Sequence, residues 1–126
     1  MWIYFLIFNL GLTMLKFEGL KEFDIEKLDN GSTVSRDFQL VFSENMLTEE
    51  ECEIVEKKLN KHDFHIKDEN IEIEVLYNID LDTVVISFTV YCPLMHLNQI
   101  SEEKISNFID KHKTNFEEYY KRVKPY

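Results

Sequence analysis

The sequence predicts an α+β fold in which a four-stranded antiparallel sheet, in the order ββαββα, carries two helices packed on one face. Three observations support this prediction. Residues 71–92 contain two segments that alternate apolar and polar side chains, Thr48 begins a helix-capping motif, and apolar residues recur every three or four positions after Ser101. A chain of 126 residues is expected to form one α+β domain, which we place at residues 14–126.

An apolar N-terminal extension, residues 1–13, precedes this domain, and the sequence leaves open whether it belongs to the core. The extension is too short to span a bilayer, which needs about 20 residues, and it lacks the basic start and the cleavage site of a signal peptide. We therefore expect no stable membrane span. Three interpretations remain open: a loosely docked extension from an upstream start, a native segment packed on the domain or a partner, and a membrane-associated segment.

A first hairpin is predicted from Leu20–Leu28 and Thr33–Ser43. The sequence Asp29-Asn30-Gly31 between them tolerates the positive φ angles that a tight hairpin turn needs. The second strand alternates cleanly, which is typical of a strand with one buried face. Its inward-facing side chains are expected to be Phe38, Leu40 and Phe42.

The first helix begins at Thr48, whose hydroxyl and the carboxylate of Glu51 fit a capping box. Three glutamates in its first turn suit the positive end of the helix dipole. We expect the helix to end near Lys61–Asp63. Its buried stripe should contain Cys52, Val55, Leu59 and His62, with Ile54 beside it.

The alternation in residues 71–92 predicts a second hairpin and the register of its two strands. For both apolar sets to share one face, Tyr77 should lie opposite Val84, with Val75 opposite Ile86 and Ile73 opposite Phe88. The loop would then be Ile79–Asp82. The other face is mixed and is expected to meet solvent or a partner, because it combines Glu72, Glu74 and Leu76 with Val85, Ser87, Thr89 and Tyr91.

The last helix has the clearest pattern. Ser101 is a suitable N-cap, basic residues gather near the end, and Pro125 stops the helix. At 1.5 Å per residue it would be roughly 34 Å long, enough to cross a small sheet. Its apolar stripe contains Ile105, Phe108, Ile109, His112, Phe116, Tyr119, Tyr120 and Val123.

The net charge of −10 is concentrated in the middle of the chain. Residues 44–82 contain thirteen acidic and four basic side chains, whereas residues 83–126 have one more basic than acidic side chain. This balance argues against direct binding of nucleic acid. It favours a partner with a basic surface or, more simply, solubility. Only two cysteines occur, without metal-type spacing, so a reducing, cytoplasmic location is expected.

The nearest approach to a metal-binding motif is the group His62, Asp63 and His65. Imidazole and carboxylate are suitable ligands for zinc or iron, so a metal-dependent hydrolase is one functional class to consider. A further ligand would have to come from His96 or His112. Because His112 lies on the apolar stripe of the last helix, a buried histidine is the simpler interpretation. We therefore expect no metal, no cofactor and no catalytic residue.

These features favour a non-enzymatic, cytoplasmic protein-binding module that presents carboxylates to a basic surface, as an inhibitor, an immunity protein or a phage-type anti-defence protein would. The alternative is a chaperone or assembly adaptor that uses apolar surface, including Met1–Leu12, Leu76, Val85 and Tyr91, to hold a client or form a homodimer. Each carboxylate has the simpler interpretation of a solvated surface group. The candidate partner-binding residues are Glu49, Glu50, Glu53, Glu56, Glu72, Glu74, Asp80 and Asp82.

Overall fold

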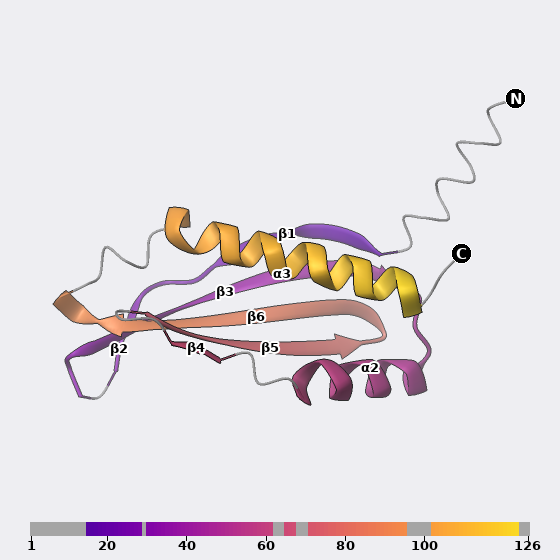
Figure 1. Cartoon of the computed structure of the whole chain (residues 1–126), viewed down its shortest axis with the longest axis horizontal. Helices are drawn as coiled ribbons and strands as arrows, with labels where there is room; N and C mark the ends of the chain where they lie inside the picture. The colour runs from indigo at the N-terminus through magenta and orange to yellow at the C-terminus, as the bar shows by residue number, and fades with distance from the viewer. Residues whose placement is uncertain (1–14, 29, 62–64, 68–70, 96–101, 124–126) are drawn as a thin grey trace, which may run out of the picture.

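The computed structural model describes residues 15–28, 30–61, 65–67, 71–95 and 102–123. It is an α+β structure with an antiparallel sheet and two helices (Figure 1). In chain order its elements are β1 (Lys16–Glu22), β2 (Glu26–Lys27), β3 (Thr33–Asn45), α2 (Glu49–Lys61), β4 (His65–Lys67), β5 (Glu72–Asp80), β6 (Asp82–Pro93) and α3 (Glu102–Val123).

Five strands lie side by side in the order β1-β3-β6-β5-β4, and the two-residue β2 also pairs with β3. All of these pairs are antiparallel. The predicted order of strands and helices is roughly confirmed, but the sheet is larger than the four strands expected. The added strand, β4, is only three residues long and lies where the sequence suggested a metal motif, so no alternating pattern could indicate it.

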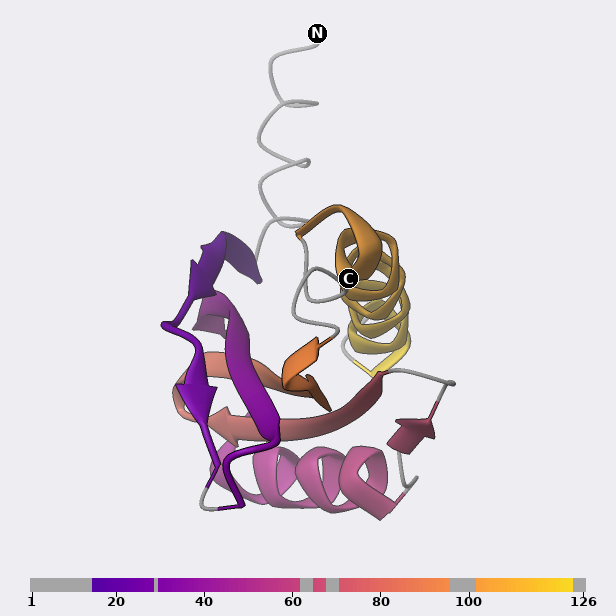
Figure 2. The ribbon, with the colours of Figure 1, turned by 90° about the vertical axis from the view of Figure 1, so that its left-hand side faces the viewer.

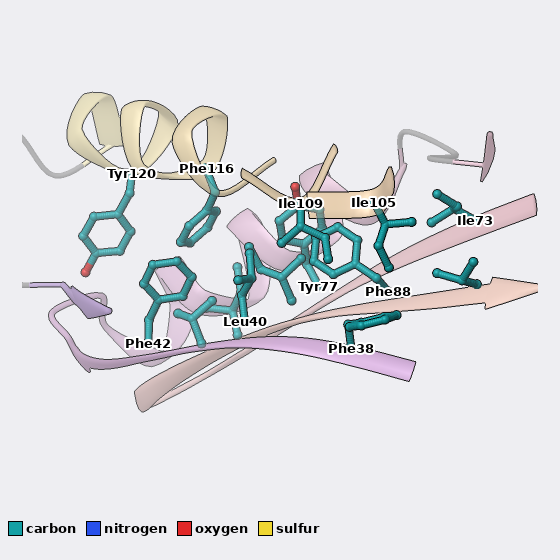
Figure 3. Close-up of a cluster of buried hydrophobic side chains, with 14 of the residues drawn as sticks. Phe38, Leu40, Phe42, Ile73, Tyr77, Phe88, Ile105, Ile109, Phe116 and Tyr120 are labelled. Atoms are coloured by element: carbon teal, nitrogen blue, oxygen red, sulfur yellow. The ribbon is translucent and has the colours of Figure 1, made fainter. Parts of the chain in front are cut away.

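One hydrophobic core fills the space between the sheet and α3 (Figure 3). Phe38, Leu40 and Phe42 of β3 point into it, as predicted, and are almost completely buried. The ring of Phe42 lies 5.5 Å from that of Phe116 of α3, measured between centroids. This separation is typical of favourable aromatic packing, so the stripe of α3 is held on this face of the sheet by direct ring contacts.

Helix α2 lies beside the part of β5 with which β4 does not pair, whereas α3 crosses one face of the sheet (Figures 1 and 2). The side-chain amide of Asn60 donates to the backbone oxygen of Tyr77 and accepts from its backbone nitrogen, both at 2.8 Å. Cys52 and Val55 still reach the core. The expectation that both helices pack on one face therefore fits α3 only. Helix α2 lies along β5 because its polar side chains form hydrogen bonds with the main-chain groups of β5 that no described strand pairs with.

The β5–β6 hairpin has the predicted faces but a different register. Tyr77 pairs with Ile86 and Ile79 with Val84, two residues away from the predicted pairing of Tyr77 with Val84. The pairing continues to Asp80 and Thr83, which leaves a two-residue turn instead of the predicted four-residue loop. The backbone of Asp82 makes this turn possible because it adopts a φ of 71°. A shift of two residues leaves every side chain on its predicted face.

The first hairpin is present, with its first strand divided into β1 and β2. The turn before β3 forms around Asn30, whose side-chain oxygen accepts hydrogen bonds from the backbone nitrogens of Ser32 and Thr33. Gly31 has a φ of 72°, as the predicted turn requires. The Asx turn and the glycine together set the reversal of the chain.

The two helices begin and end close to the predicted residues. At the start of α2, Thr48 Oγ1 accepts from the Glu51 backbone nitrogen at 3.2 Å, and Glu51 Oε1 accepts from the Thr48 backbone nitrogen at 2.9 Å. The capping box is thus confirmed. Helix α2 ends at Lys61, and α3 runs from Glu102 to Val123. The predicted N-cap, Ser101, and the predicted stop, Pro125, lie outside the described residues.

Candidate functional site

The candidate site is the face of the sheet that points away from α3. No described helix lies on that side of the sheet (Figure 2). The face is formed by the outward side chains of the three central strands, and most of the β3 and β6 side chains on it are half-buried. Leu76 stands out in its middle with 59% of its surface exposed. The β3, β6 and β5 members of this open face are Asp37, Gln39, Val41, Ser43, Thr83, Val85, Ser87, Thr89, Tyr91, Glu72, Glu74, Leu76, Asn78 and Asp80.

Three carboxylates gather around Tyr91 at one end of the open face, and we call Asp37, Glu72 and Glu74 the acidic patch. Glu72 pairs with Tyr91, and both Asp37 and Glu74 pair with Thr89, from opposite sides of β6. Burial raises the pKa of the Tyr91 hydroxyl, and the negative charge of Glu74, a hydrogen bond to its carboxylate, and the charges of Asp37 and Glu72 raise it further. The patch therefore creates a negative potential at the tyrosine.

The predicted site residues do not form one continuous surface. Glu72 and Glu74 belong to the acidic patch, whereas Asp80 lies at the other end of β5, about 20–26 Å along the strand. Asp80 is the last paired residue before the turn of the hairpin, Asp82 lies in the turn, and both are exposed. Helix α2 carries a third group, the exposed Glu49, Glu50 and Glu53. The negative charge of the middle of the chain is therefore divided among three places.

Glu56, also a predicted partner-binding residue, has an internal role. Its Oε2 accepts a hydrogen bond of 2.6 Å from the backbone nitrogen of Ile79. The side chain is half-buried between α2 and β5, next to the Asn60–Tyr77 hydrogen bonds. A carboxylate that satisfies an edge amide has one fewer acceptor for a partner.

Asp37 was not among the predicted residues although it belongs to the acidic patch. In the sequence it precedes Phe38 in a predicted strand, and its outward direction follows from the alternation. Its proximity to Glu74 depends on β6 lying between β3 and β5. The strand order, which does not follow from the alternation of side chains, was the missing information.

The proposed metal motif is not tested by the described part of the chain. His62 and Asp63 lie outside it, and of His65 only the main chain is described, paired with Glu74. Within the described residues, no three histidine, cysteine or acidic side chains are grouped so that they could hold a metal ion.

Three of the buried titratable groups of the core, His112, Cys52 and Cys92, are held in their uncharged forms by their surroundings. His112 Nδ1 lies 3.4 Å from the Tyr77 hydroxyl, and its ring meets that of Phe88 edge-on. Burial and the neighbouring charge of Lys111 lower the pKa of His112, so its neutral form is favoured. Cys52 and Cys92 are buried free thiols whose pKa values are raised chiefly by burial, which disfavours the nucleophilic thiolate.

Comparison of the chain with protein-family models, with curated proteins and with solved structures yields no match. Over the described residues, neither helix combines the length and the apolar character needed to cross a membrane.

Proposed function

We propose that this chain is a small protein-binding module, without enzymatic activity, that uses the open sheet face to engage a basic surface of a partner protein. Inhibitors, immunity proteins and anti-defence proteins are classes that work in this way. The observation that carries the proposal is the acidic patch: three carboxylates from two strands, arranged around Tyr91 on a face that no described helix covers.

Negative charge on the open face would affect both the rate and the specificity of association with a basic partner. Carboxylates on a rigid sheet attract a basic surface over several ångströms and can raise association rates about 10-fold to 10³-fold at low ionic strength. The neighbouring middle of the open face is uncharged, with Leu76 exposed and Val41 and Val85 half-buried. An apolar centre beside a charged rim is the common arrangement of protein interfaces.

The test compares two double variants that change the net charge equally. Asp37→Asn with Glu74→Gln neutralises two carboxylates of the acidic patch, and Asp110→Asn with Glu118→Gln neutralises two exposed carboxylates of α3. A partner isolated from the native host should associate more slowly with the first variant than with the second, as measured by surface plasmon resonance. The difference should vanish at about 1 M salt, where the Debye length is about 3 Å.

An equal effect of the two variants, or no effect of salt on the association rate, would contradict this function. The exposed Leu76 favours one alternative, a chaperone or assembly adaptor that binds a client or a second copy through apolar surface. In that case binding would persist at high salt and be lost in Leu76→Glu. The two functions therefore give opposite results in one titration.

A further inference from the structure

One edge of β5 is only partly paired with another strand. The opposite edge pairs with β6 over the whole length of β5, from Glu72 to Asp80. On the first edge, β4 pairs only with Glu72, Ile73 and Glu74. Within the described residues, the rest of this edge, Val75–Ile79, pairs with no strand. Free main-chain groups at a sheet edge are the usual place where a strand of another molecule adds.

The segment Val75–Ile79 has the composition of a strand that pairs readily. It contains no charged residue, and its Val, Tyr and Ile side chains are types enriched in strands. The charged Glu74 and Asp80 stand directly before and after it. Short charge-free segments of high β propensity are prone to pair between molecules, and flanking charges oppose such pairing. The part of β5 best suited to pair with another strand therefore begins where β4 ends.

Helix α2 occupies this edge in the place of a strand. The side-chain amide of Asn60 donates to the Tyr77 backbone oxygen and accepts from the Tyr77 backbone nitrogen, both at 2.8 Å. In an antiparallel ladder, two residues of a hydrogen-bonded pair exchange the same two bonds. Glu56 continues the arrangement, because its Oε2 accepts from the Ile79 backbone nitrogen at 2.6 Å.

The spacing of these contacts explains why a helix can replace a strand here. Asn60 and Glu56 lie four residues apart in α2, which is about 6 Å along the helix axis. Tyr77 and Ile79 lie two residues apart in β5, which is about 6.7 Å along the strand. Because the two repeats nearly match, consecutive turns of α2 reach consecutive outward-facing main-chain groups of β5.

We propose that Asn60 and Glu56 make α2 a substitute strand, and that Val75–Ile79 pairs with the same segment of a second copy when these contacts are removed. A second copy fits this edge because it carries the same charge-free segment, and two antiparallel copies exchange identical main-chain groups about a two-fold axis. Pairing requires α2 to move away from β5, which the buried Cys52 and Val55 oppose. The edge of β5 is distinct from the open sheet face, so its pairing does not depend on the proposed function.

The test uses the full-length double variant Glu56→Ala with Asn60→Ala. Loss of the three hydrogen bonds should raise the fraction of molecules with an accessible edge about 10-fold to 100-fold. Analytical ultracentrifugation should then detect self-association that the wild type lacks at the same concentrations. The Tyr77 amide of the variant should exchange faster than in the wild type at low concentration and more slowly as dimers form. Glu53→Ala with Asn115→Ala changes the charge equally at exposed positions and should behave as the wild type does.

A peptide provides a second measurement on a milder variant. A fluorescein-labelled peptide of residues 72–80 should bind folded Asn60→Ala about 10-fold more tightly than it binds the wild type, as measured by fluorescence anisotropy. The same peptide with Asn78→Pro should not bind, because proline cannot donate to a ladder and does not fit a central strand. If the double variant does not fold, this titration decides, and equal binding to Asn60→Ala and the wild type counts against the proposal.

Two further results would overturn the proposal. The folded double variant could stay monomeric at every concentration, with a Tyr77 exchange rate that does not depend on concentration, which would mean that the contacts of α2 only stabilise the fold. The control variant could self-associate equally, or the proline-containing peptide could bind as tightly as the unmodified one, which would assign the association to another surface. Circular dichroism of each variant verifies that the domain has folded.

Discussion

Asn60 is the residue whose replacement tests most directly how α2 is held against β5. In Asn60→Ala, the backbone nitrogen and oxygen of Tyr77 each lose a partner at 2.8 Å. In this half-buried position we assign about 1–2 kcal/mol to each lost bond, since water replaces part of it. Alanine recovers about 0.5 kcal/mol through its higher helix propensity. The expected loss in the free energy of unfolding is therefore about 1.5–3.5 kcal/mol.

Urea unfolding measures this loss, and hydrogen exchange locates it. The Tyr77 amide should exchange faster in Asn60→Ala under native conditions, because it no longer donates to Asn60. Asn115→Ala is the matched control, since it is an exposed asparagine inside α3 and should not destabilise the protein. Equal unfolding midpoints for Asn60→Ala and the wild type, together with an unchanged Tyr77 exchange rate, would refute this account of the sheet edge.

Two further predictions concern the core. Tyr120→Phe should lower the free energy of unfolding by about 1–3 kcal/mol. The lost hydroxyl accepts a hydrogen bond from the Met46 backbone nitrogen at 2.8 Å and donates one to Asn45 Oδ1 at 2.9 Å. Tyr119→Phe is the control, and equal urea midpoints for the two variants would contradict a stabilising role of these two hydrogen bonds. The second prediction concerns His112, whose pKa is lowered in the folded protein from an ordinary value of 6.5. As the pH falls below 6.5, the unfolded chain binds a proton at this histidine more readily than the folded chain does, so the free energy of unfolding of the wild type should decrease. The stability difference between wild type and His112→Gln should therefore shrink from neutral pH to about pH 5, and parallel pH profiles from urea unfolding would count against this titration.

The sequence carried enough information for the elements and their faces but too little for their exact pairing. Alternation in β5 and β6 predicted which side chains point inward, and the Thr48 capping box predicted the start of α2. Registers that differ by two residues give the same faces, so alternation could not distinguish them. The positive φ of Asp82 decides the register, and a sequence pattern without glycine gave little indication of it.

The candidate site was predicted only in part for a related reason. Glu72 and Glu74 could be placed on the outer face from alternation alone, but Asp37 joins them only because β6 separates β3 from β5. Glu56 was predicted to be a surface residue of an amphipathic helix, and the polar Asn60 carries no sequence signal that sets it apart from such residues. Both instead contact the main chain of β5, since a helix beside a strand edge can satisfy backbone groups with its polar side chains. No local pattern distinguishes such residues from solvated ones.

The central position of β6 has a consequence for biosynthesis. Both long partners of this strand, β3 and β5, are made before it and pair with it rather than with each other. On the ribosome, a nascent chain that ends before residue 82 can form only the hairpin of β1, β2 and β3 and the short β4–β5 pair, and isolated two-stranded hairpins are marginal in water. The full sheet is therefore expected to form only after Pro93, the last residue of β6, has left the exit tunnel. Strands β3 and β5 then pair with β6 on its two sides.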